Sequence, residues 1–317
     1  MRKGEASRTA AYMALFRALE FTLPAGQRLF EDRFASAFLP LGLRFVVHLS
    51  RIRLAGSLVR AYIDRQWPGA RTSAVARTKF IDDAAEEALR AGIGQVVILG
   101  AGFDARAYRI PGMGRAAVFE VDHPSTSAGK RRVIEKVLGS PPHVRFVAID
   151  FNSEALPGAM RSAGYDPSLR TLFIWEGVTN YLTEVAVDET LRWCASAAVG
   201  STVLFTYVHR HVLDSLGVFE GTEKLFATLR AAGERWTFGL DPSSLWTFLA
   251  ERGLMLDEDV GASEYRALYF GPSANHMRGY EFYRIAVARV PEIPPTTETP
   301  PNKPFEPTPE RRPGSTA

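Results

Sequence analysis

The sequence predicts an α/β protein whose mostly parallel sheet is preceded by a helical cap and closed by an antiparallel C-terminal hairpin. Residues 7–92 show helical periodicity only. From residue 95 to about residue 207, short apolar runs rich in β-branched residues alternate with helical stretches, and two further β-like stretches follow. Strands and helices that alternate at this spacing are typical of βαβ units, which build parallel sheets.

The helical cap is expected to comprise residues 1–92. Ser7 is predicted to cap a first helix that runs through Phe21, with apolar residues spaced at about 3.6 positions. Proline or glycine stands at the end of each later helix and would terminate it. These later helices are expected at residues 32–39, 43–66 and 72–92.

The core is expected to comprise residues 93–290 and to contain five parallel strands. Their apolar runs lack polar alternation, which indicates burial on both faces of the sheet. The strands are expected at residues 95–99, 116–121, 144–149, 171–175 and 201–207, with helices between them at about 125–138, 154–163 and 184–198. An insertion at about 208–238, a helix at 243–252 and a hairpin of residues 266–270 and 281–290 would complete the core.

Proline sets the C-terminal end of the chain apart. The chain has 20 prolines, and nine of them fall between Pro291 and Pro313. This stretch is too poor in apolar residues to offset its ordering entropy by burial. Residues 291–317 are therefore expected to form a disordered or polyproline II tail that the chemistry of the core does not need.

The composition is that of an ordinary globular protein. Among 317 residues, 46% are hydrophobic and 23% are charged, and a net charge of +3 does not predict nucleic-acid binding. Between residues 42 and 79, however, eight Arg or Lys residues accompany a single acid, Asp64. A solvated helix face is the more common explanation of such a bias, and a surface that draws acidic substrates or anionic lipid is the other.

Cysteine content and hydropathy restrict the class of protein further. The single cysteine, Cys194, cannot form an internal disulfide, and no Cys or His spacing predicts a zinc site. It lies in an apolar helical stretch and is expected to be a buried, inert thiol. No apolar run is long enough to span a membrane and the N-terminus lacks a signal-peptide pattern, so a cytoplasmic location is expected. The oligomeric state is left open.

A glycine-rich turn and an acid mark the expected ligand site. Gly100 and Gly102 follow the first strand and let the backbone bend sharply and approach a ligand closely. Asp122 ends the second strand, where a carboxylate can accept hydrogen bonds from both hydroxyls of a ribose. The pattern therefore predicts a cofactor that contains a nucleoside.

The turn alone leaves two cofactors open, NAD(P) and S-adenosylmethionine, because it matches the G-x-G-x-x-G/A dinucleotide pattern. Such a pattern usually opens its domain, whereas a helical stretch of residues 7–92 precedes this one, and no second βαβαβ half follows. Acids also recur at the next strand ends, as Asp150 beside Phe151 and then as Glu176, where ligands of open α/β sheets bind. These features favour S-adenosylmethionine.

Taken together, the motifs resemble those of the leucine carboxyl methyltransferase-like group of class I S-adenosylmethionine-dependent methyltransferases, which includes polyketide carboxyl methyltransferases. The matching motifs occur in family order at residues 7–10, 77–82, 97–109, 120–124, 150–151 and 176–182. The resemblance implies a class I methyltransferase Rossmann-like fold. It also implies methyl transfer from S-adenosyl-L-methionine, with a carboxylate of a small molecule or peptide as the expected acceptor.

The resemblance further implies a role for each matching residue. Arg77 would pair with the cofactor's carboxylate, and Glu176 would face its amino group. The glycine turn would pass under the methionine and ribose, and Asp122 would hold the ribose hydroxyls. Asp150 and Phe151 would hold the adenine. For Arg77, which begins an acid-rich helical stretch, a surface ion pair is the alternative.

The acceptor side is less well defined by the sequence. A carboxylate is ionised at neutral pH and needs no general base, whereas a hydroxyl or phenol often does. His209, after the fifth strand, is the candidate base, and Tyr181 is the candidate that orients the acceptor; a structural role is the alternative for both. Arg8 and Tyr12, on a first helix that would act as a lid, and Asn180 are the candidate acceptor-binding residues.

The sequence is also compatible with three other functions. They are a hydroxyl or phenol O-methyltransferase of natural-product metabolism, an NAD(P)-dependent oxidoreductase, and a non-enzymatic binding module with a degenerate nucleotide pocket. No metal ion is expected, because the two histidines at 209 and 211 have no third ligand nearby in the sequence.

Overall fold

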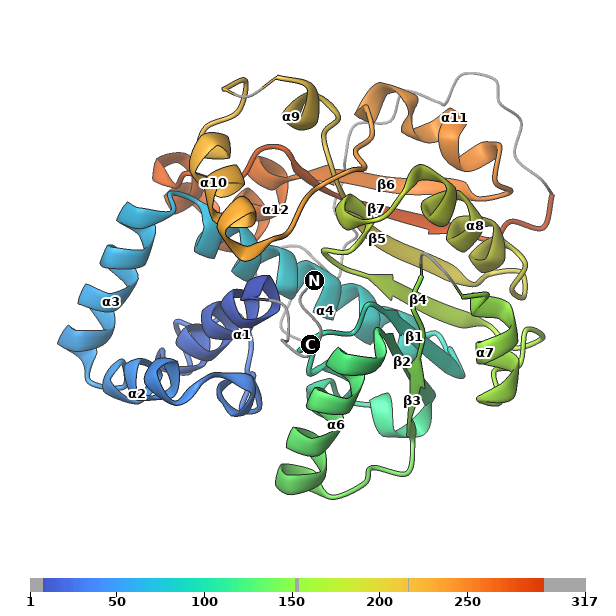
Figure 1. Ribbon diagram of the computed structural model, residues 1–317, viewed down its shortest axis with the longest axis horizontal. Coiled ribbons are helices and arrows are strands. Elements are labelled where there is room, and N and C mark those ends of the chain that lie inside the picture. The colour runs from blue at the N-terminus through green and yellow to red at the C-terminus, as the bar shows by residue number, and fades with distance from the viewer. Residues whose placement is uncertain (1–7, 152–153, 216, 294–317) are drawn as a thin grey trace.

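Seven strands form one sheet at the centre of the computed structural model, which describes residues 8–293 except 152–153 and 216 (Figure 1). The strand order is β3-β2-β1-β4-β5-β7-β6; the first five pair in parallel, and β7 is antiparallel to both β5 and β6. The predicted α/β fold is confirmed. The strands are β1 (Gln95–Leu99), β2 (Ala117–Asp122), β3 (Val144–Ala148), β4 (Thr171–Trp175), β5 (Thr202–Val208), β6 (Met255–Gly261) and β7 (Tyr283–Arg289).

Helices cover both faces of the sheet, which explains why the central strands are apolar throughout. Every residue of β1 and β4 is buried. On one face, Val97 and Phe173 share a core with α7 (Leu156–Ser162), α8 (Glu184–Ala195) and α11 (Leu245–Ala250). On the other face, Val96 and Leu172 share a core with α4 (Ala70–Arg90) and α12 (Ala262–Phe270). Side chains of consecutive strand residues point to opposite faces, so each central strand contributes to both cores.

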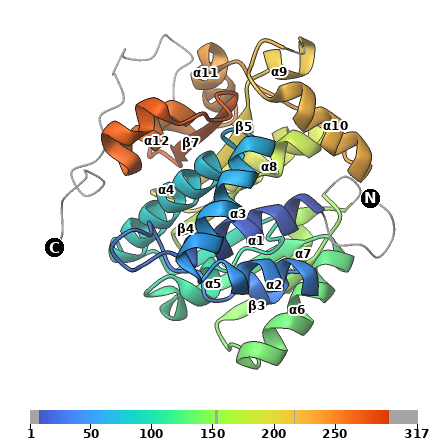
Figure 2. The ribbon, with the colours of Figure 1, turned by 90° about the vertical axis from the view of Figure 1, so that its left-hand side faces the viewer.

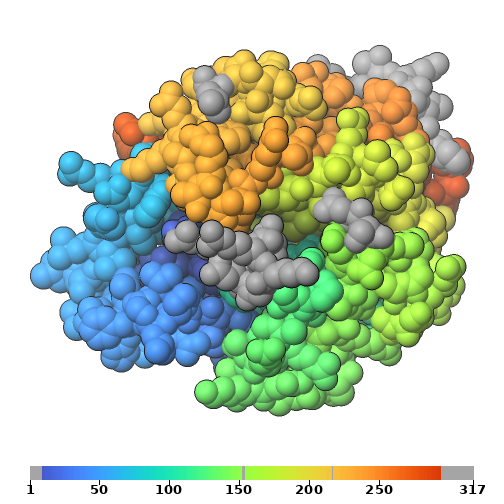
Figure 3. Space-filling view, viewed as in Figure 1, coloured from blue at the N-terminus to red at the C-terminus, as the bar shows by residue number. Residues whose placement is uncertain are grey.

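A third apolar cluster joins the N-terminal helices to the ends of the strands. It contains residues of α1 (Arg8–Phe21), α2 (Leu41–Leu49), α3 (Arg53–Gln66), α6 (Pro124–Leu138) and α10 (Thr222–Ala232). It also contains Phe103, just after β1, and Val208, the last residue of β5. Figure 2 shows α1, α2 and α3 side by side, and in Figure 3 α1 lies recessed between the α2–α3 helices and α6. These helices therefore lie over the carboxyl ends of the parallel strands.

The N-terminal helices differ in detail from the prediction. The expected helix at 43–66 is two helices, because the chain turns at residues 50–52, where the Ser50 hydroxyl donates to the Val46 carbonyl (2.8 Å). The expected helix at 32–39 is only the 3₁₀ turn η1 (Ala35–Phe38), which the Asp32 carboxylate caps by accepting from the backbone N–H of Ala35 (2.9 Å). Ser7 lies outside the described residues.

The C-terminal hairpin is present, but one of its strands was placed wrongly. Residues 266–270 are the end of α12, and the strand that pairs with β7 is β6. β6 is the last strand of the sheet, so only one of its edges is hydrogen-bonded, and it carries three acids, Asp257, Glu258 and Asp259. An edge strand tolerates such polarity because its outer side faces solvent.

The remaining elements are short. The segment after β5 contains α9 (His211–Asp214) and α10, and the expected helix at 243–252 is divided between a 3₁₀ turn and α11. The other short elements are α5 (Arg106–Arg109), η2 (Met113–Arg115), η3 (Thr179–Tyr181), η4 (Pro242–Ser244) and η5 (Gly271–His276). Within the described ranges, no helix is both long and apolar enough to cross a membrane. The predicted tail lies outside the described residues from residue 294 on.

Candidate cofactor and acceptor site

The turn after β1 requires glycine at its first position. Gly100 has a φ of +64° and Gly102 a φ of +42°, a region of backbone conformation that residues with a Cβ rarely adopt. A Cβ on Gly100 would also lie 2.3 Å from Cγ2 of Val178, which is closer than real Cβ atoms approach. Two separate features therefore require glycine at position 100, the backbone conformation and the packing of Val178 in the loop after β4.

Asp122, the last residue of β2, lies directly beside this turn. Its carboxylate accepts hydrogen bonds from the backbone N–H of Gly102 and from that of His123 (2.6 Å). Burial raises the pKa of Asp122, and the two backbone N–H groups oppose that effect by stabilising its charge. The other acid of the strand, Glu120, does not line the cavity; it forms a buried ion pair with Lys130 (2.9 Å) and accepts a hydrogen bond from Tyr108 (2.9 Å).

A buried ion network holds Glu176 at the end of β4. One carboxylate oxygen of Glu176 accepts from Nε of Arg77 on α4 (2.8 Å), and the other accepts from Nη1 of Arg106 on α5 (2.7 Å). Burial opposes ionisation, but the two guanidinium groups outweigh it and lower the pKa of Glu176 to about 2. Glu176 is therefore a fixed negative charge at neutral pH.

Arg106 is the centre of this network, and no role was predicted for it from the sequence. Besides Glu176, its guanidinium contacts Asp104 (2.6 Å) and Asp82 (2.8 Å), and Arg109 contacts the same Asp82 (2.7 Å). Only 2% of the Arg106 side chain is exposed. The residues come from α4, the glycine turn, α5 and β4, so the network ties together the elements that surround the strand ends. Its signal in the sequence is the alternation of Asp and Arg directly after the glycines.

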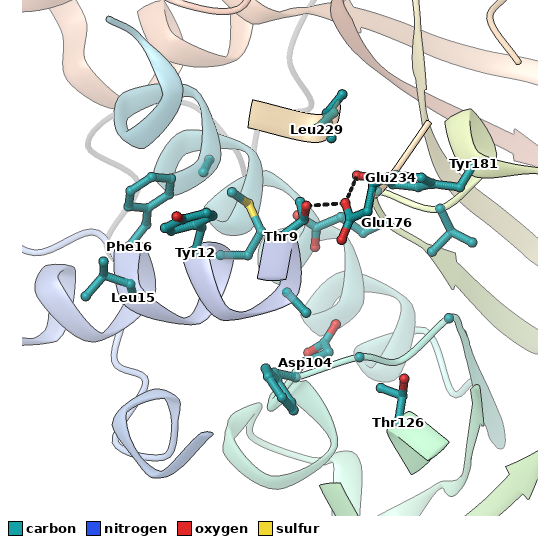
Figure 4. A pocket seen from close by; sticks show the side chains of 18 of the residues that line it. Thr9, Tyr12, Leu15, Phe16, Asp104, Thr126, Glu176, Tyr181, Leu229 and Glu234 are labelled. Atoms are coloured by element: carbon teal, nitrogen blue, oxygen red, sulfur yellow. Dashed lines mark hydrogen bonds between the residues drawn. The ribbon is translucent and has the colours of Figure 1, made fainter. Parts of the chain in front are cut away.

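The glycine turn, Asp122 and Glu176 line one cavity of about 1410 Å³, part of which is shown in Figure 4. Its wall includes nine residues that the sequence predicted, seven of them at or after strand ends and two on the helices α1 and α4: Tyr12, Arg77, Gly100, Gly102, Asp122, Asp150, Phe151, Glu176 and Tyr181. Away from the strand ends, the wall is formed by apolar side chains of the N-terminal helices and α10, which include Leu15, Phe16, Leu43, Val46, Val59, Ile63, Leu225 and Leu229. The cavity thus has a polar end and an apolar arm.

Glu234 lines the cavity and is, after Arg106, the second residue of the site that sequence reasoning missed. It follows α10, and its Oε2 accepts a hydrogen bond from the Tyr181 hydroxyl (3.1 Å) and one from the Thr9 hydroxyl on α1 (Figure 4). Burial raises the pKa of Tyr181, so its hydroxyl stays protonated at neutral pH. Because Glu234 lies in an irregular insertion far from the glycine motif in sequence, nothing in the pattern marked it.

Two predicted residues lie outside the cavity wall. The ring of His209 packs between His211 (4.7 Å between ring centroids) and Phe219 (5.5 Å), and burial lowers its pKa. Asn180 is fully buried, and its backbone carbonyl accepts from the backbone N–H of Thr237 (2.8 Å). Neither residue is among those that line the cavity. Arg8 is the first residue of α1, and its side chain lies outside the described part of the chain.

The fold and the site define a class of enzyme that binds a nucleoside-containing cofactor at the carboxyl ends of a parallel sheet. The sequence model of leucine carboxyl methyltransferases matches residues 10–195 of this chain. A relative from Mycolicibacterium smegmatis, named as an S-adenosyl-L-methionine-dependent methyltransferase, is 32% identical over 244 residues, 75% of each chain. Another of that name, from Frankia alni, is 37% identical over 209 residues, 65% of this chain and 70% of its own.

Two crystal structures show the same fold. One is described as a methyltransferase of Thermobifida fusca and has a TM-score of 0.54 at 18% identity, covering 91% of this chain and 96% of its own. The other is a DUF574 family protein of Streptomyces avermitilis, with a TM-score of 0.56 at 16% identity, covering 91% and 99%. At such low identity the likeness concerns the fold alone.

The chain belongs to the leucine carboxyl methyltransferase family and is an S-adenosylmethionine-dependent methyltransferase. This decides between the two cofactors that the glycine turn left open.

Proposed function

We propose that the chain methylates a carboxylate of a small molecule or peptide, so that the product is a methyl ester. The cofactor, when bound, supplies an electrophilic methyl group on a sulfonium, and the protein supplies position and electrostatics. The polar end of the cavity would hold the cofactor, and the acceptor would approach from the apolar arm.

The residues at the strand ends fit this cofactor. Val178 occupies the space that a Cβ of Gly100 would need, so only backbone atoms of Gly100 line the cavity there. Asp122 would accept from the ribose hydroxyls, and the fixed charge of Glu176 suits the ammonium of the methionine. Arg77 lines the same end and would bind the methionine carboxylate. Asp150 and Phe151 line the wall where the adenine would lie.

The chemistry of the cavity wall near Tyr181 supports a carboxylate acceptor. Among the described lining residues the only histidine is His123, which lies beside Asp122 and contacts the Ser125 hydroxyl (2.8 Å). Tyr181 stays protonated, and the Glu234 oxygen nearest to it already accepts two hydroxyl hydrogen bonds. A hydroxyl acceptor must lose a proton, whereas a carboxylate is ionised at neutral pH and needs no base. The lack of a histidine base at this position is the observation that carries the proposal.

The size and lining of the apolar arm indicate the kind of molecule that bears the carboxylate. Pockets for small ligands commonly enclose about 300–1,000 Å³. The cavity here, at about 1410 Å³, is larger, and the additional space lies among aliphatic and aromatic side chains. An acceptor whose carboxylate is joined to an extended apolar body would fill it.

The proposal can be tested with a methyl-labelled cofactor and pairs of acceptors that share one apolar body and differ in carrying a carboxylate or a phenol. We expect transfer to the carboxylates, at a rate that is flat between about pH 6 and pH 8 because the acceptor is fully ionised there. The Glu234→Gln variant is expected to retain this transfer. The opposite result would be methyl transfer to the phenols at a rate that Glu234→Gln lowers by about 100-fold or more. That result would identify Glu234 as a general base and a hydroxyl as the acceptor.

A further inference from the structure

The helices α2 and α3 carry a concentration of exposed apolar side chains. On α2, Leu41, Phe45 and Leu49 follow one another at a spacing of four residues, and on α3 the same spacing relates Leu54, Leu58 and Tyr62. Together with Ile52 between the helices, these seven side chains are between 37% and 81% exposed. Residues four apart lie on the same side of a helix, so each helix presents one apolar stripe to solvent.

This concentration is particular to α2 and α3. Of the 14 large apolar side chains that the described part of the chain exposes, seven fall within residues 41–62, and the others are distributed over several elements. Figures 1 and 2 place both helices at the outside of the molecule, on the left in Figure 1 and facing the viewer in Figure 2. Single exposed apolar residues are normal on a protein surface, but a contiguous patch marks an interaction site.

Basic side chains accompany the stripe. Arg44, Arg51, Arg53 and Arg65 are exposed on or between the same two helices. The one acid of this segment, Asp64, is paired with Arg71 on α4 (2.6 Å), so its charge is already compensated. The face therefore combines apolar side chains with an excess of positive charge.

We propose that the α2–α3 face docks on the surface of an anionic lipid bilayer. Helices of this kind lie in the interface, with apolar side chains among the acyl chains and arginines on the phosphates. A second copy of the chain fits this surface poorly, because a two-fold interface would bring the same arginines together without acids to pair with them. An anionic headgroup layer supplies the opposite charge and the apolar partner at once.

The position of the cavity agrees with this orientation. Leu58 and Tyr62 belong to the exposed stripe, with 63% and 61% of their surface accessible, and both also line the cavity. The apolar arm thus reaches the docking face. If the acceptor is lipophilic, as in the proposed function, it can pass between bilayer and cavity there, but the docking itself does not depend on what the acceptor is.

Vesicle sedimentation with the full-length chain tests the proposal. We expect binding to vesicles of phosphatidylcholine with phosphatidylglycerol, weaker binding to phosphatidylcholine alone, and loss of binding at high salt. The double variant Phe45→Ser/Leu54→Ser should bind at least about tenfold more weakly, given the apolar area that two such side chains bury. Val185→Ser/Val218→Ser removes two equally exposed valines, 65% and 58%, on other elements and should bind like the unaltered chain.

A second pair of variants separates charge from apolar contact. Arg51→Gln/Arg53→Gln should weaken binding to the anionic vesicles only, while Arg131→Gln/Arg132→Gln on α6 should not change it. No binding to anionic vesicles, equal binding to both vesicle types, or binding that Phe45→Ser/Leu54→Ser leaves unchanged would each overturn the proposal. A dimer in light scattering that the same double variant dissociates would overturn it as well, by showing that the face joins two copies.

Discussion

Replacing Glu176 by glutamine tests the buried ion network at the end of β4. The substitution keeps the shape of the side chain and removes the charge that Arg77 and Arg106 share. The pKa of the carboxyl falls from an ordinary 4.5 to about 2, which corresponds to about 3 kcal/mol in favour of its ionised form in the folded chain. Only 18% of this side chain is exposed, so solvent screens the interaction weakly. We therefore expect Glu176→Gln to lower the free energy of unfolding by about 3 kcal/mol at pH 7.

Urea denaturation of the cofactor-free chain at several pH values measures this effect. A carboxyl whose pKa is lowered by folding contributes its full stabilisation above its unfolded pKa and loses it as the pH falls through its folded pKa. The difference between Glu176→Gln and the unaltered chain should thus be constant above about pH 5 and shrink as the pH falls from 4.5 toward about 2.

Glu135→Gln is the matched control. Glu135 pairs with Arg131 on the surface of α6, where the two side chains are 42% and 61% exposed. Exposed pairs contribute about 1 kcal/mol or less, so this variant should remain close to the unaltered chain. If Glu176→Gln were as stable as Glu135→Gln, or if its effect did not change between pH 5 and pH 2.5, the charge on Glu176 would not be what holds the network.

Three further predictions concern single positions. Gly100→Ala places a Cβ 2.3 Å from Cγ2 of Val178, so we expect calorimetry to show a loss of S-adenosylhomocysteine binding. Gly114→Ala is the control, because nothing lies within 4 Å of its added Cβ, and this variant should bind normally. Equal affinities of the two variants would refute the packing argument. Asp122→Ala should weaken the same binding by about tenfold to 100-fold through lost hydrogen bonds to the ribose, and an unchanged affinity would contradict that assignment. Burial raises the pKa of Cys194, so its thiol should react with iodoacetamide only after unfolding, and fast labelling of the folded chain would show that it is accessible.

The parallel strands could be predicted because burial on both faces leaves a strong signal. β1 and β4 are buried and apolar at nearly every position, as strands covered on both faces require. β6 gave no such signal. Its acids are compatible with an edge, and Asp259 is stabilised by a pairing with Arg284 (3.0 Å) that only the folded sheet brings about.

The acids of the site could be predicted for a similar reason, since their position follows from the topology. Asp122 and Glu176 stand where strands end, and the carboxyl ends of parallel strands meet at one edge. The orientation of a side chain is not fixed by that rule. His209 also follows a strand, but its ring packs against Phe219 in the insertion, which the strand pattern does not reveal. Glu234 reaches the cavity only because α10 folds back over α1, a contact between segments far apart in the sequence.

The buried ion network has a visible pattern in the sequence, but that pattern does not predict its burial. Asp104, Arg106 and Arg109 stand two and three residues apart in the sequence. Charged residues at this spacing on a short helix are typical of a solvated surface. Their burial follows from the position of Asp82 on α4, which no local pattern places beside them.

The proposed methyl ester and the ether of the alternative hydroxyl acceptor differ in their stability in base, so the base lability of the product distinguishes the two acceptors. The label transferred from a methyl-labelled cofactor to the best acceptor of the carboxylate and phenol pairs should be released as methanol by mild base. No label should be transferred to the acceptor when the Gly100→Ala variant replaces the unaltered chain. A label that stays on the acceptor in base, as an ether does, would contradict the claim and place the acceptor among hydroxyl compounds.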